Sequence, residues 1–144
     1  MLNAYRKARV LAKKFPDVLV IGADTEVCLG GRVFGKPKNR RVAEQMLSEL
    51  EGREHQVITG VCLIYLRRHR QRTFADTTRV TFKPLGADEI AEYLDRVNPL
   101  DKAGAYALQE HGEMIVQKTE GSTANVVGLP IEKLRIELRT FVAE

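Results

Sequence analysis

The sequence contains few of the residues that bind metals or cross-link a chain. Its 144 residues include two cysteines, Cys28 and Cys62, and three histidines, His55, His69 and His111, and none of them is spaced as in a zinc site. Two distant cysteines provide no disulfide framework, so we expect a protein of the reducing cytoplasm. The sequence shows no Ser/His/Asp arrangement and no reactive-cysteine motif either. These absences argue against zinc enzymes, disulfide-stapled secreted domains and nucleophilic catalysis.

Long apolar runs are missing as well. No stretch approaches the roughly 20 consecutive apolar residues that a membrane-spanning helix needs, so we expect no membrane partner. Hydrophobic residues make up 44% of the chain and charged residues 29%, which is the balance of a globular domain. The sequence therefore predicts a folded core without disulfide or metal staples.

The excess of positive charge is small and largely local. The net charge is +4, and five of the six residues at 67–72 are Arg or His. Surfaces that bind single-stranded nucleic acid interleave such charges with aromatic residues, and none occurs in this run. We therefore expect a solvated hairpin turn here and no nucleic-acid partner.

Hydrophobic periodicity predicts a single α/β domain over residues 1–144 with a mixed sheet. Apolar residues at helical spacing predict helices at 1–14, 39–51, 87–97 and from Pro130 onward. Runs rich in β-branched and aromatic residues predict strands at 18–23, 55–66 and 72–82, with short strands near 106–109 and 114–118. Gly30-Gly31 lies between two further strand-like runs, as in a hairpin turn whose central residues need positive φ.

Two lysines stand out by their surroundings. Lys7 falls on the apolar stripe of the first predicted helix, where an ammonium group needs a partner or must extend past the rim of the core. Lys36 lies between Gly35 and Pro37 on a stiff loop, where it could meet a phosphate as a point charge or simply be solvated. Both are candidate ligands for an anionic substrate.

The segment Gly22-Ala23-Asp24-Thr25 is expected to close a buried strand with a carboxylate and a hydroxyl. Ligands of open α/β sheets bind beyond the carboxyl ends of the strands. Asp24 could there coordinate a divalent cation or accept a proton from water. The alternative is that Asp24 only caps a turn.

Residues 101–106, with Gln109 shortly after them, are rich in small and polar side chains. Alanine and glycine allow a ligand to approach the backbone, and the Gln109 amide can both donate and accept hydrogen bonds. That pairing suits uracil or thymine, whose edge shows carbonyl acceptors on either side of an N–H donor. The alternative is a loop packed by small residues.

Taken in order, these motifs resemble the Maf family of nucleoside triphosphate pyrophosphatases, from about Ala4 to Leu138. The series comprises Lys7-Ala8, Gly22-Ala23-Asp24-Thr25, Gly35-Lys36-Pro37, residues 55–61 (HQVITGV), residues 101–106 (DKAGAY) with Gln109, and residues 125–130 (NVVGLP). The specificity of the resemblance lies in the ordered set. It implies an α/β fold of the inosine triphosphate pyrophosphatase-like type.

The resemblance also implies a function. Members hydrolyse a nucleoside triphosphate to the monophosphate and pyrophosphate with a divalent metal, Mg²⁺ or Mn²⁺. By this resemblance Asp24 activates water or holds the metal, and the substrate-binding residues are Lys7, Thr25, Lys36, Lys102 and Gln109. The two lysines Lys7 and Lys36 would hold the phosphates, and Thr25 and Gln109 would help to choose the base. The Lys-Ala-Gly-Ala-Tyr form with a following Gln resembles the branch that acts on dTTP and UTP.

The resemblance breaks at the start of the chain. Family members open with a strand, a Ser-Pro-Arg-Arg loop and a helix, and none of these precedes Leu2. We therefore expect an N-terminally truncated domain whose uncovered surface favours a homodimer. Loss of the arginine clamp leaves a non-catalytic nucleotide-binding protein as the alternative function. A basic nucleic-acid-binding protein is a more distant one.

Overall fold

A long antiparallel hairpin forms the spine of the fold. The computed structural model describes residues 2–143, and in it β3 (Glu54–Tyr65) and β4 (Arg70–Phe82) pair along their whole length. Their β-branched and aromatic residues suit a pleated, half-buried surface. The chain reverses at His69, whose φ of 54° lies in the left-handed region. The predicted pair of strands around a turn at His69 is confirmed.

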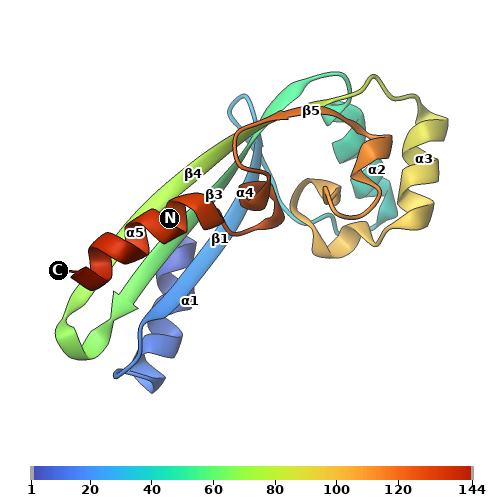
Figure 1. Cartoon of the computed structure of the whole chain (residues 1–144). Helices are drawn as coiled ribbons and strands as arrows, with labels where there is room; N and C mark the ends of the chain where they lie inside the picture. Colours follow the sequence, from blue (N-terminus) through green and yellow to red (C-terminus); the bar gives the residue numbers. More distant parts are fainter. Residues whose placement is uncertain (1, 144) are drawn as a thin grey trace.

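The other three strands extend this hairpin on both sides (Figure 1). β1 (Val20–Leu29) pairs with β3, β2 (Arg32–Phe34) pairs with the end of β1, and β5 (Val116–Glu120) pairs with β4. The order is β2-β1-β3-β4-β5. The α/β class is confirmed. Every strand pair within residues 2–143 is antiparallel, where we expected a mixed sheet, because tight turns join β1 to β2 and β3 to β4 and no crossover brings two strands into parallel register.

Four of the five α-helices within residues 2–143 coincide with predicted ones. The helices are α1 (Leu2–Lys14), α2 (Arg40–Leu50), α3 (Ala87–Arg96), α4 (Thr123–Val127) and α5 (Ile131–Ala143). Met1, the first residue of the first predicted helix, lies outside the described residues, and the short helix α4 was not predicted. The strand predicted at 106–109 is wrong. Gly104 and Ala105, with φ of 71° and 68°, turn the chain away from the sheet immediately before it.

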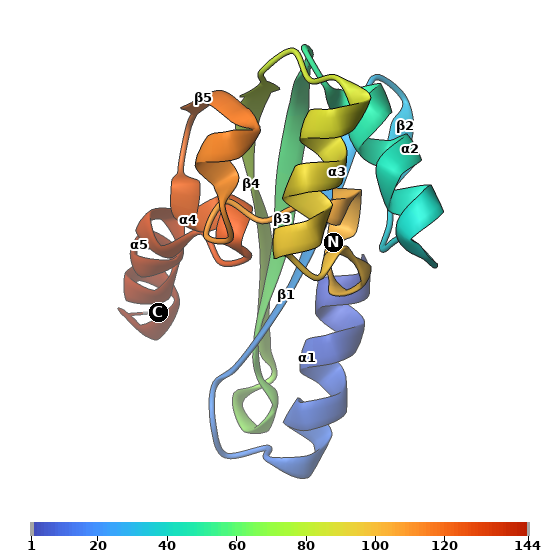
Figure 2. The same cartoon turned by 90° about the vertical axis from the view of Figure 1, so that its right-hand side faces the viewer.

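Helices cover both faces of the sheet. Alternate residues of β3 separate the faces: Cys62 and Ile64 pack with α1, whereas Val61 and Leu63 pack with α5. Figure 2 shows α1 and α5 on opposite sides of the long strands. Val57 has the same parity as Val61, and it belongs to the core that α2 and α3 build at the other end of the sheet. α4 contacts β3 and β4 between these two regions.

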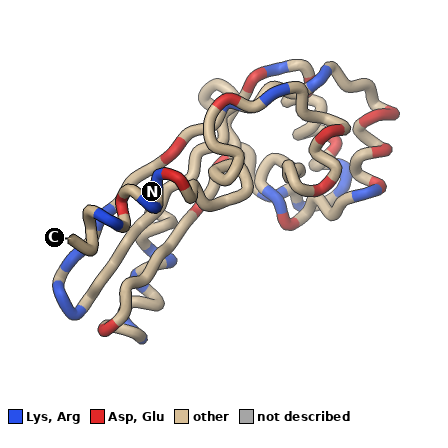
Figure 3. Tube along the Cα trace, in the orientation of Figure 1, with Lys and Arg blue, Asp and Glu red and all other residues tan. Residues whose placement is uncertain are grey.

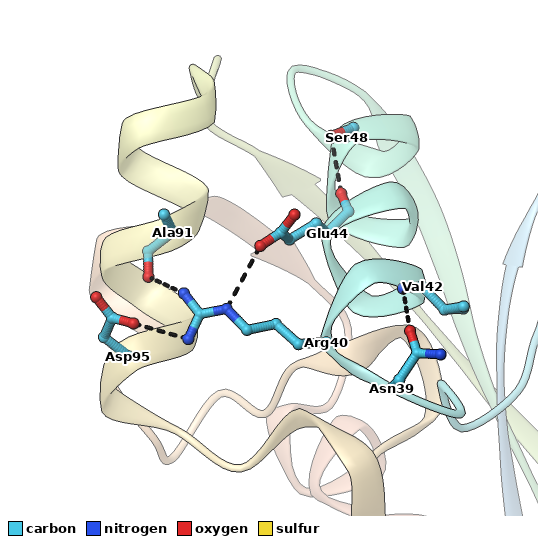
Figure 4. Close-up of polar contacts among 7 residues, drawn as sticks. All are labelled: Asn39, Arg40, Val42, Glu44, Ser48, Ala91 and Asp95. Atoms are coloured by element: carbon cyan, nitrogen blue, oxygen red, sulfur yellow. Dashed lines mark hydrogen bonds and ion pairs between the residues drawn. The ribbon is translucent and has the colours of Figure 1, made fainter.

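Arg40 at the start of α2 also contacts α3 through polar groups (Figure 4). Arg40 Nη1 lies 2.7 Å from a carboxylate oxygen of Asp95, and its Nη2 donates to the Ala91 carbonyl at 3.1 Å. Asn39 caps α2 by accepting a hydrogen bond from the Val42 N–H.

α1 approaches β1 closely because Gly22 has no side chain. A Cβ on Gly22 would lie 2.4 Å from the Ala4 carbonyl oxygen and 2.8 Å from the Ala8 Cβ. The buried face of α1 is therefore a row of alanines. The apolar stripe predicted for this helix is wrong at Leu11 and Phe15, whose exposed fractions are 46% and 56%.

The basic turn at residues 67–72 is largely exposed, as expected for a solvated hairpin turn, and three of its arginines also contact the rest of the molecule. Figure 3 shows its positive charge at the far end of the hairpin. Arg67 forms an ion pair with Asp17 at 2.7 Å, and Arg72 donates to the carbonyl and carboxylate of Glu137 in α5. Arg70 lies over the Phe141 ring at 4.2 Å. The contacts of Arg70 and Arg72 are part of the packing of α5, whereas Arg67 connects the turn to the segment that follows α1. No helix of residues 2–143 has the length and apolarity to span a membrane.

Candidate functional site

A cleft of about 340 Å³ opens at the outer edge of β1 and collects the residues singled out from the sequence. The six predicted site residues all line it: Lys7, Asp24, Thr25, Lys36, Lys102 and Gln109. They come from α1, from β1, from the loop after β2 and from the irregular chain between α3 and β5. The fold thus brings together side chains that lie as far apart in the sequence as positions 7 and 109.

β1 presents an unpaired edge to this cleft. β2 pairs with β1 only at Val27–Leu29, so within residues 2–143 the stretch 20–26 has a neighbouring strand on one side only. The expectation that Asp24 closes the strand is wrong, because pairing with β3 continues without a break to Cys28. Asp24 and Thr25 are successive residues and point to opposite faces of the sheet. The cleft therefore wraps around the strand edge and receives one side chain from each face.

On the face covered by α1, Asp24 is held by two side chains from that helix. Lys7 Nζ lies 2.8 Å from Asp24 Oδ1, and Asn3 Nδ2 donates to Oδ2 at 3.3 Å. Lys7 Nζ also lies 3.3 Å from the Ala23 carbonyl oxygen, which points out of the sheet. Partial burial raises the pKa of Asp24, but the hydrogen bonds from Lys7 and Asn3 and the charge of Lys7 outweigh it, so the pKa lies below its usual value. Asp24 is therefore an ionised carboxylate at neutral pH.

On the opposite face, Thr25 leads into a buried chain of hydrogen bonds. Its Oγ1 lies 2.9 Å from Thr59 Oγ1, and the Thr59 hydroxyl donates to the Asn125 carbonyl at 3.0 Å. Thr59 and Asn125 are fully buried. The Asn125 side-chain amide donates in turn to the carbonyls of Val57 and Asp76, which fixes α4 against β3 and β4.

The loops opposite β1 are joined by a backbone bond. The Gly104 N–H donates to the Gly35 carbonyl at 3.1 Å, which fixes the segment carrying Lys36 beside residues 101–109. Gly104 has φ of 71°, and a Cβ there would lie 3.1 Å from the Val27 side chain. This glycine is needed for both its backbone conformation and the close approach to β1.

Lys102 and Gln109 both line the cleft, but they differ in their hydrogen bonding. The Lys102 ammonium donates to the Asn98 carbonyl and lies 2.7 Å and 2.6 Å from the carboxylates of Asp101 and Glu110. Desolvation lowers the pKa of Lys102, but these two carboxylates raise it above its usual value. The exposed Gln109 amide, by contrast, has no hydrogen-bond partner among residues 2–143. Its donor and acceptor remain available to a ligand.

Sequence reasoning assigned no role to the buried pair behind the cleft, His55 and Tyr106. His55 Nε2 lies 2.6 Å from the Tyr106 hydroxyl, and both rings pack edge to face with Phe82. Burial lowers the pKa of His55 to about 4. Tyr106 also lines the cleft, so this neutral pair supports its wall. The sequence shows a histidine on the apolar face of a predicted strand, but it does not show that Tyr106 is its partner.

The donor set for a metal is small. Among residues 2–143 no group of three His, Cys, Asp or Glu side chains comes together to form a metal site. Two carboxylates line the cleft, Asp24 and Asp101. Asp24 forms an ion pair with Lys7, and Asp101 forms one with Lys102. Mg²⁺ is commonly bound by one or two carboxylates together with substrate phosphates and water. The residues present fit a cation that arrives with a phosphorylated ligand, held on the protein side by Asp24.

Comparison with known proteins agrees with these motifs. Residues 1–141 match a family described as Maf-like protein. A protein of Bacillus velezensis named dTTP/UTP pyrophosphatase is 46% identical over 138 residues, which are 96% of this chain and 72% of the relative. Proteins of the same name from Carboxydothermus hydrogenoformans and Myxococcus xanthus are 46% and 48% identical, over 94% and 89% of this chain and 73% and 64% of their own lengths. The chain belongs to the Maf family.

Proposed function

We propose that this chain hydrolyses dTTP, UTP or related pyrimidine nucleoside triphosphates to the monophosphate and pyrophosphate in the cleft at the β1 edge. The observation that carries the proposal is that all six residues expected to act on such a substrate line one cleft. Relatives that share almost half of their residues with the chain carry the name dTTP/UTP pyrophosphatase. The reaction cleaves the anhydride bond between the α- and β-phosphates by water.

The positive end of the cleft would hold the triphosphate. Lys7 and Lys36 bring two ammonium groups to the same cleft, where each can act as a point charge on phosphate oxygens. Lys102 differs from them, because its three hydrogen-bond donors already face Asn98, Asp101 and Glu110. We assign Lys102 to the shape of the loop beside the substrate, and Lys7 and Lys36 to the phosphates.

Asp24 would act on the attacking water or on the cation. While Lys7 is bound to Asp24, the low pKa of that carboxyl makes it a weak base. A substrate phosphate competes with Asp24 for Lys7. When Lys7 binds the phosphate instead, Asp24 loses the hydrogen bond and charge that lower its pKa. The carboxylate then becomes a better acceptor for the proton that water loses as it attacks phosphorus.

A divalent cation, Mg²⁺ or Mn²⁺, completes the proposal. Asp24 would hold such a cation together with the substrate phosphates, and the cation would supply positive charge to neutralise the leaving pyrophosphate. Asp24 and Lys7 would then orient the phosphate chain from the α1 side of the strand. Thr25 and Gln109 would contact the base from the other side, where Val126 and Val127 supply apolar surface.

Pyrophosphate release from dTTP and UTP with Mg²⁺ or Mn²⁺ tests the function. Asp24→Asn keeps the shape of the side chain and removes its charge, and we expect turnover to fall by about a thousandfold or more. Asp17→Asn is the matched control, because Asp17 pairs with Arg67 outside the cleft, and it should leave turnover unchanged. Saturable nucleotide binding without turnover in the unmodified chain would replace hydrolysis by a non-catalytic binding role.

Self-association remains a second, separate proposal. Several large apolar side chains of α1 and of the chain that follows it are exposed: Leu2, Val10, Leu11, Phe15, Val18 and Ile21. They support the homodimer expected from the sequence. Light scattering on the eluting protein measures its mass directly, and a monomer at micromolar concentration would contradict a dimer. The cytoplasmic location stays a prediction.

A further inference from the structure

The hydroxyl of Thr25 has a fixed polarity, and this follows from counting hydrogens. The Thr59 hydroxyl has one hydrogen, and the Asn125 carbonyl that it faces at 3.0 Å can only accept. That hydrogen is therefore used toward Asn125. Thr25 Oγ1 lies 2.9 Å from Thr59 Oγ1, so the hydrogen between these two oxygens has to come from Thr25.

Thr25 can then offer only lone pairs to a ligand in the cleft. Its single hydroxyl hydrogen points inward to Thr59, which is fully buried and cannot turn to another partner in solvent. Asn125 cannot shift either, because its side-chain amide is bound to two backbone carbonyls and to the Thr78 hydroxyl. The group facing Thr25 from a bound ligand must accordingly be a donor.

Gln109 alone does not determine whether the ligand group that faces it must donate or accept a hydrogen bond. A glutamine amide presents an oxygen in one orientation and an N–H in the other, and the Gln109 amide has no partner within residues 2–143 to hold either one. The two pyrimidine types differ at ring position N3, which is an N–H donor in uracil and thymine and a bare acceptor in cytosine. A fixed acceptor that faces N3 distinguishes these two bases, whereas a rotating amide accommodates both.

We propose that Thr59 and Asn125 are positioning residues that make Thr25 an obligate acceptor, and that this acceptor selects uracil and thymine over cytosine. The inference rests on the proposed function in one respect, namely that a pyrimidine nucleotide occupies the cleft. Thr59 acts only through Thr25. The Thr25 side chain faces the part of the cleft that Val126 and Val127 of α4 also line.

Thr59→Val tests the inference because it removes the hydroxyl and keeps the shape of the side chain. The Asn125 carbonyl still accepts from the Gly128 N–H at 3.1 Å, so it does not become unpaired. Thr25 is then free to turn its hydrogen into the cleft and donate to N3 of cytosine. We expect the UTP-to-CTP ratio of kcat/KM to fall by about tenfold, mainly through a gain on CTP, and the UMP-to-CMP ratio of affinities to fall similarly in calorimetry.

Two further variants separate this effect from damage to the fold. Thr59→Ser restores the hydroxyl and should return both ratios to within about twofold of the unmodified chain. Thr25→Val removes the acceptor itself, so it should weaken UMP binding by about tenfold and leave CMP binding unchanged. The Thr25 variant decides the question if Thr59→Val does not fold.

The outcomes distinguish this inference from the proposed function. The inference is overturned if the unmodified chain does not prefer uracil, or if Thr59→Val lowers both nucleotides equally or leaves the ratio unchanged. Hydrolysis of UTP with an unchanged ratio would overturn the inference and keep the function. The expected shift in UMP and CMP binding without pyrophosphate release would keep the inference and overturn hydrolysis. Failure of the unmodified chain to bind either nucleotide overturns both.

Discussion

The two faces of β1 bring side chains to the same cleft by opposite means. On the α1 face, Lys7 and Asp24 form an ion pair whose side chains are 59% and 23% exposed. On the α4 face, Thr25 leads through Thr59 to Asn125, and the latter two are fully buried and uncharged. An exposed ion pair can exchange partners when a substrate arrives, whereas a buried hydrogen-bond chain cannot. The comparison separates a part of the site that adapts from a part that is preorganised.

The largest effect is expected from a charge placed on the buried α4 face. Asn125→Asp would turn a carboxylate oxygen toward the carbonyls of Val57 and Asp76, which now accept from the side-chain amide. We expect the free energy of unfolding to fall by about 4 kcal/mol, since a buried charge without a partner is costly. Urea unfolding followed by circular dichroism measures the loss.

The same substitution at an exposed position provides its control. Asn39 caps α2 in solvent, and aspartate caps a helix as well as asparagine does. Asn39→Asp should therefore change the free energy of unfolding by less than about 0.5 kcal/mol. Equal effects of the two substitutions would contradict a buried face that excludes charge.

Protonation of His55 in acid brings a charge to the buried side of the molecule without a mutation. The pKa of His55 is lowered from 6.5 to about 4 by burial against Phe82 and Tyr106. The unfolded chain therefore binds a proton at a higher pH than the folded one, and the contribution of His55 to stability is complete above pH 6.5 and is lost as pH falls to 4. The loss attributable to His55 is about 3 kcal/mol by linkage.

His55→Gln isolates this contribution, because it removes the titration and keeps a side chain that can bond to Tyr106. The free energy of unfolding of this variant should change less steeply than that of the unmodified chain between pH 6.5 and 4. The exposed His69 in the hairpin turn is the comparison, because His69→Gln removes an imidazole that lies in solvent rather than in the core. A slope that His55→Gln does not change would show that burial of this histidine is not what disfavours acid.

The α1 face depends on close packing rather than on excluding charge. Gly22→Ala would place a methyl group 2.4 Å from the Ala4 carbonyl oxygen, so α1 must move away from β1. We expect a loss of about 2 kcal/mol in unfolding free energy and weaker contact between Lys7 and Asp24. Gly31→Ala is the matched control, because a Cβ there meets nothing within 4 Å and the residue has no positive φ. Similar losses in both variants would mean that the helix contact does not decide the cost.

Local patterns were sufficient for part of the fold. Ala43, Met46, Leu47 and Leu50 recur at helical spacing, and all four are buried in α2. β1 was predicted too short because Asp24-Thr25-Glu26 interrupts its apolar run, and only pairing with β3 carries the strand through these polar residues. The helical and hairpin signals lie within one element, whereas the extent of β1 depends on a partner that is distant in the sequence.

The candidate site likewise has a part that local motifs predict and a part that depends on partners distant in the sequence. Six of the residues that line the cleft were predicted from motifs, and the structure brings these six together. The roles of Thr59 and Asn125 were not predicted, although both lie in the motifs that carry the family resemblance. Those roles come from hydrogen bonds between β1, β3 and α4, and a sequence shows a hydroxyl but not the direction in which it donates.

The smallest effect on stability is expected where the comparison predicts adaptability. Lys7→Met removes an ammonium that is mostly exposed, so the free energy of unfolding should change by less than about 0.5 kcal/mol. The pKa of Asp24 should rise nonetheless, because partial burial remains while the hydrogen bond and charge of Lys7 are lost. The carboxyl ¹³C shift of Asp24, followed against pH, measures this, and Arg67→Met opposite Asp17 controls for the loss of an exposed pair outside the cleft. A large loss of stability with an unmoved Asp24 pKa would make the ion pair a structural support, and the distinction between an adaptable face and a fixed one would then fail.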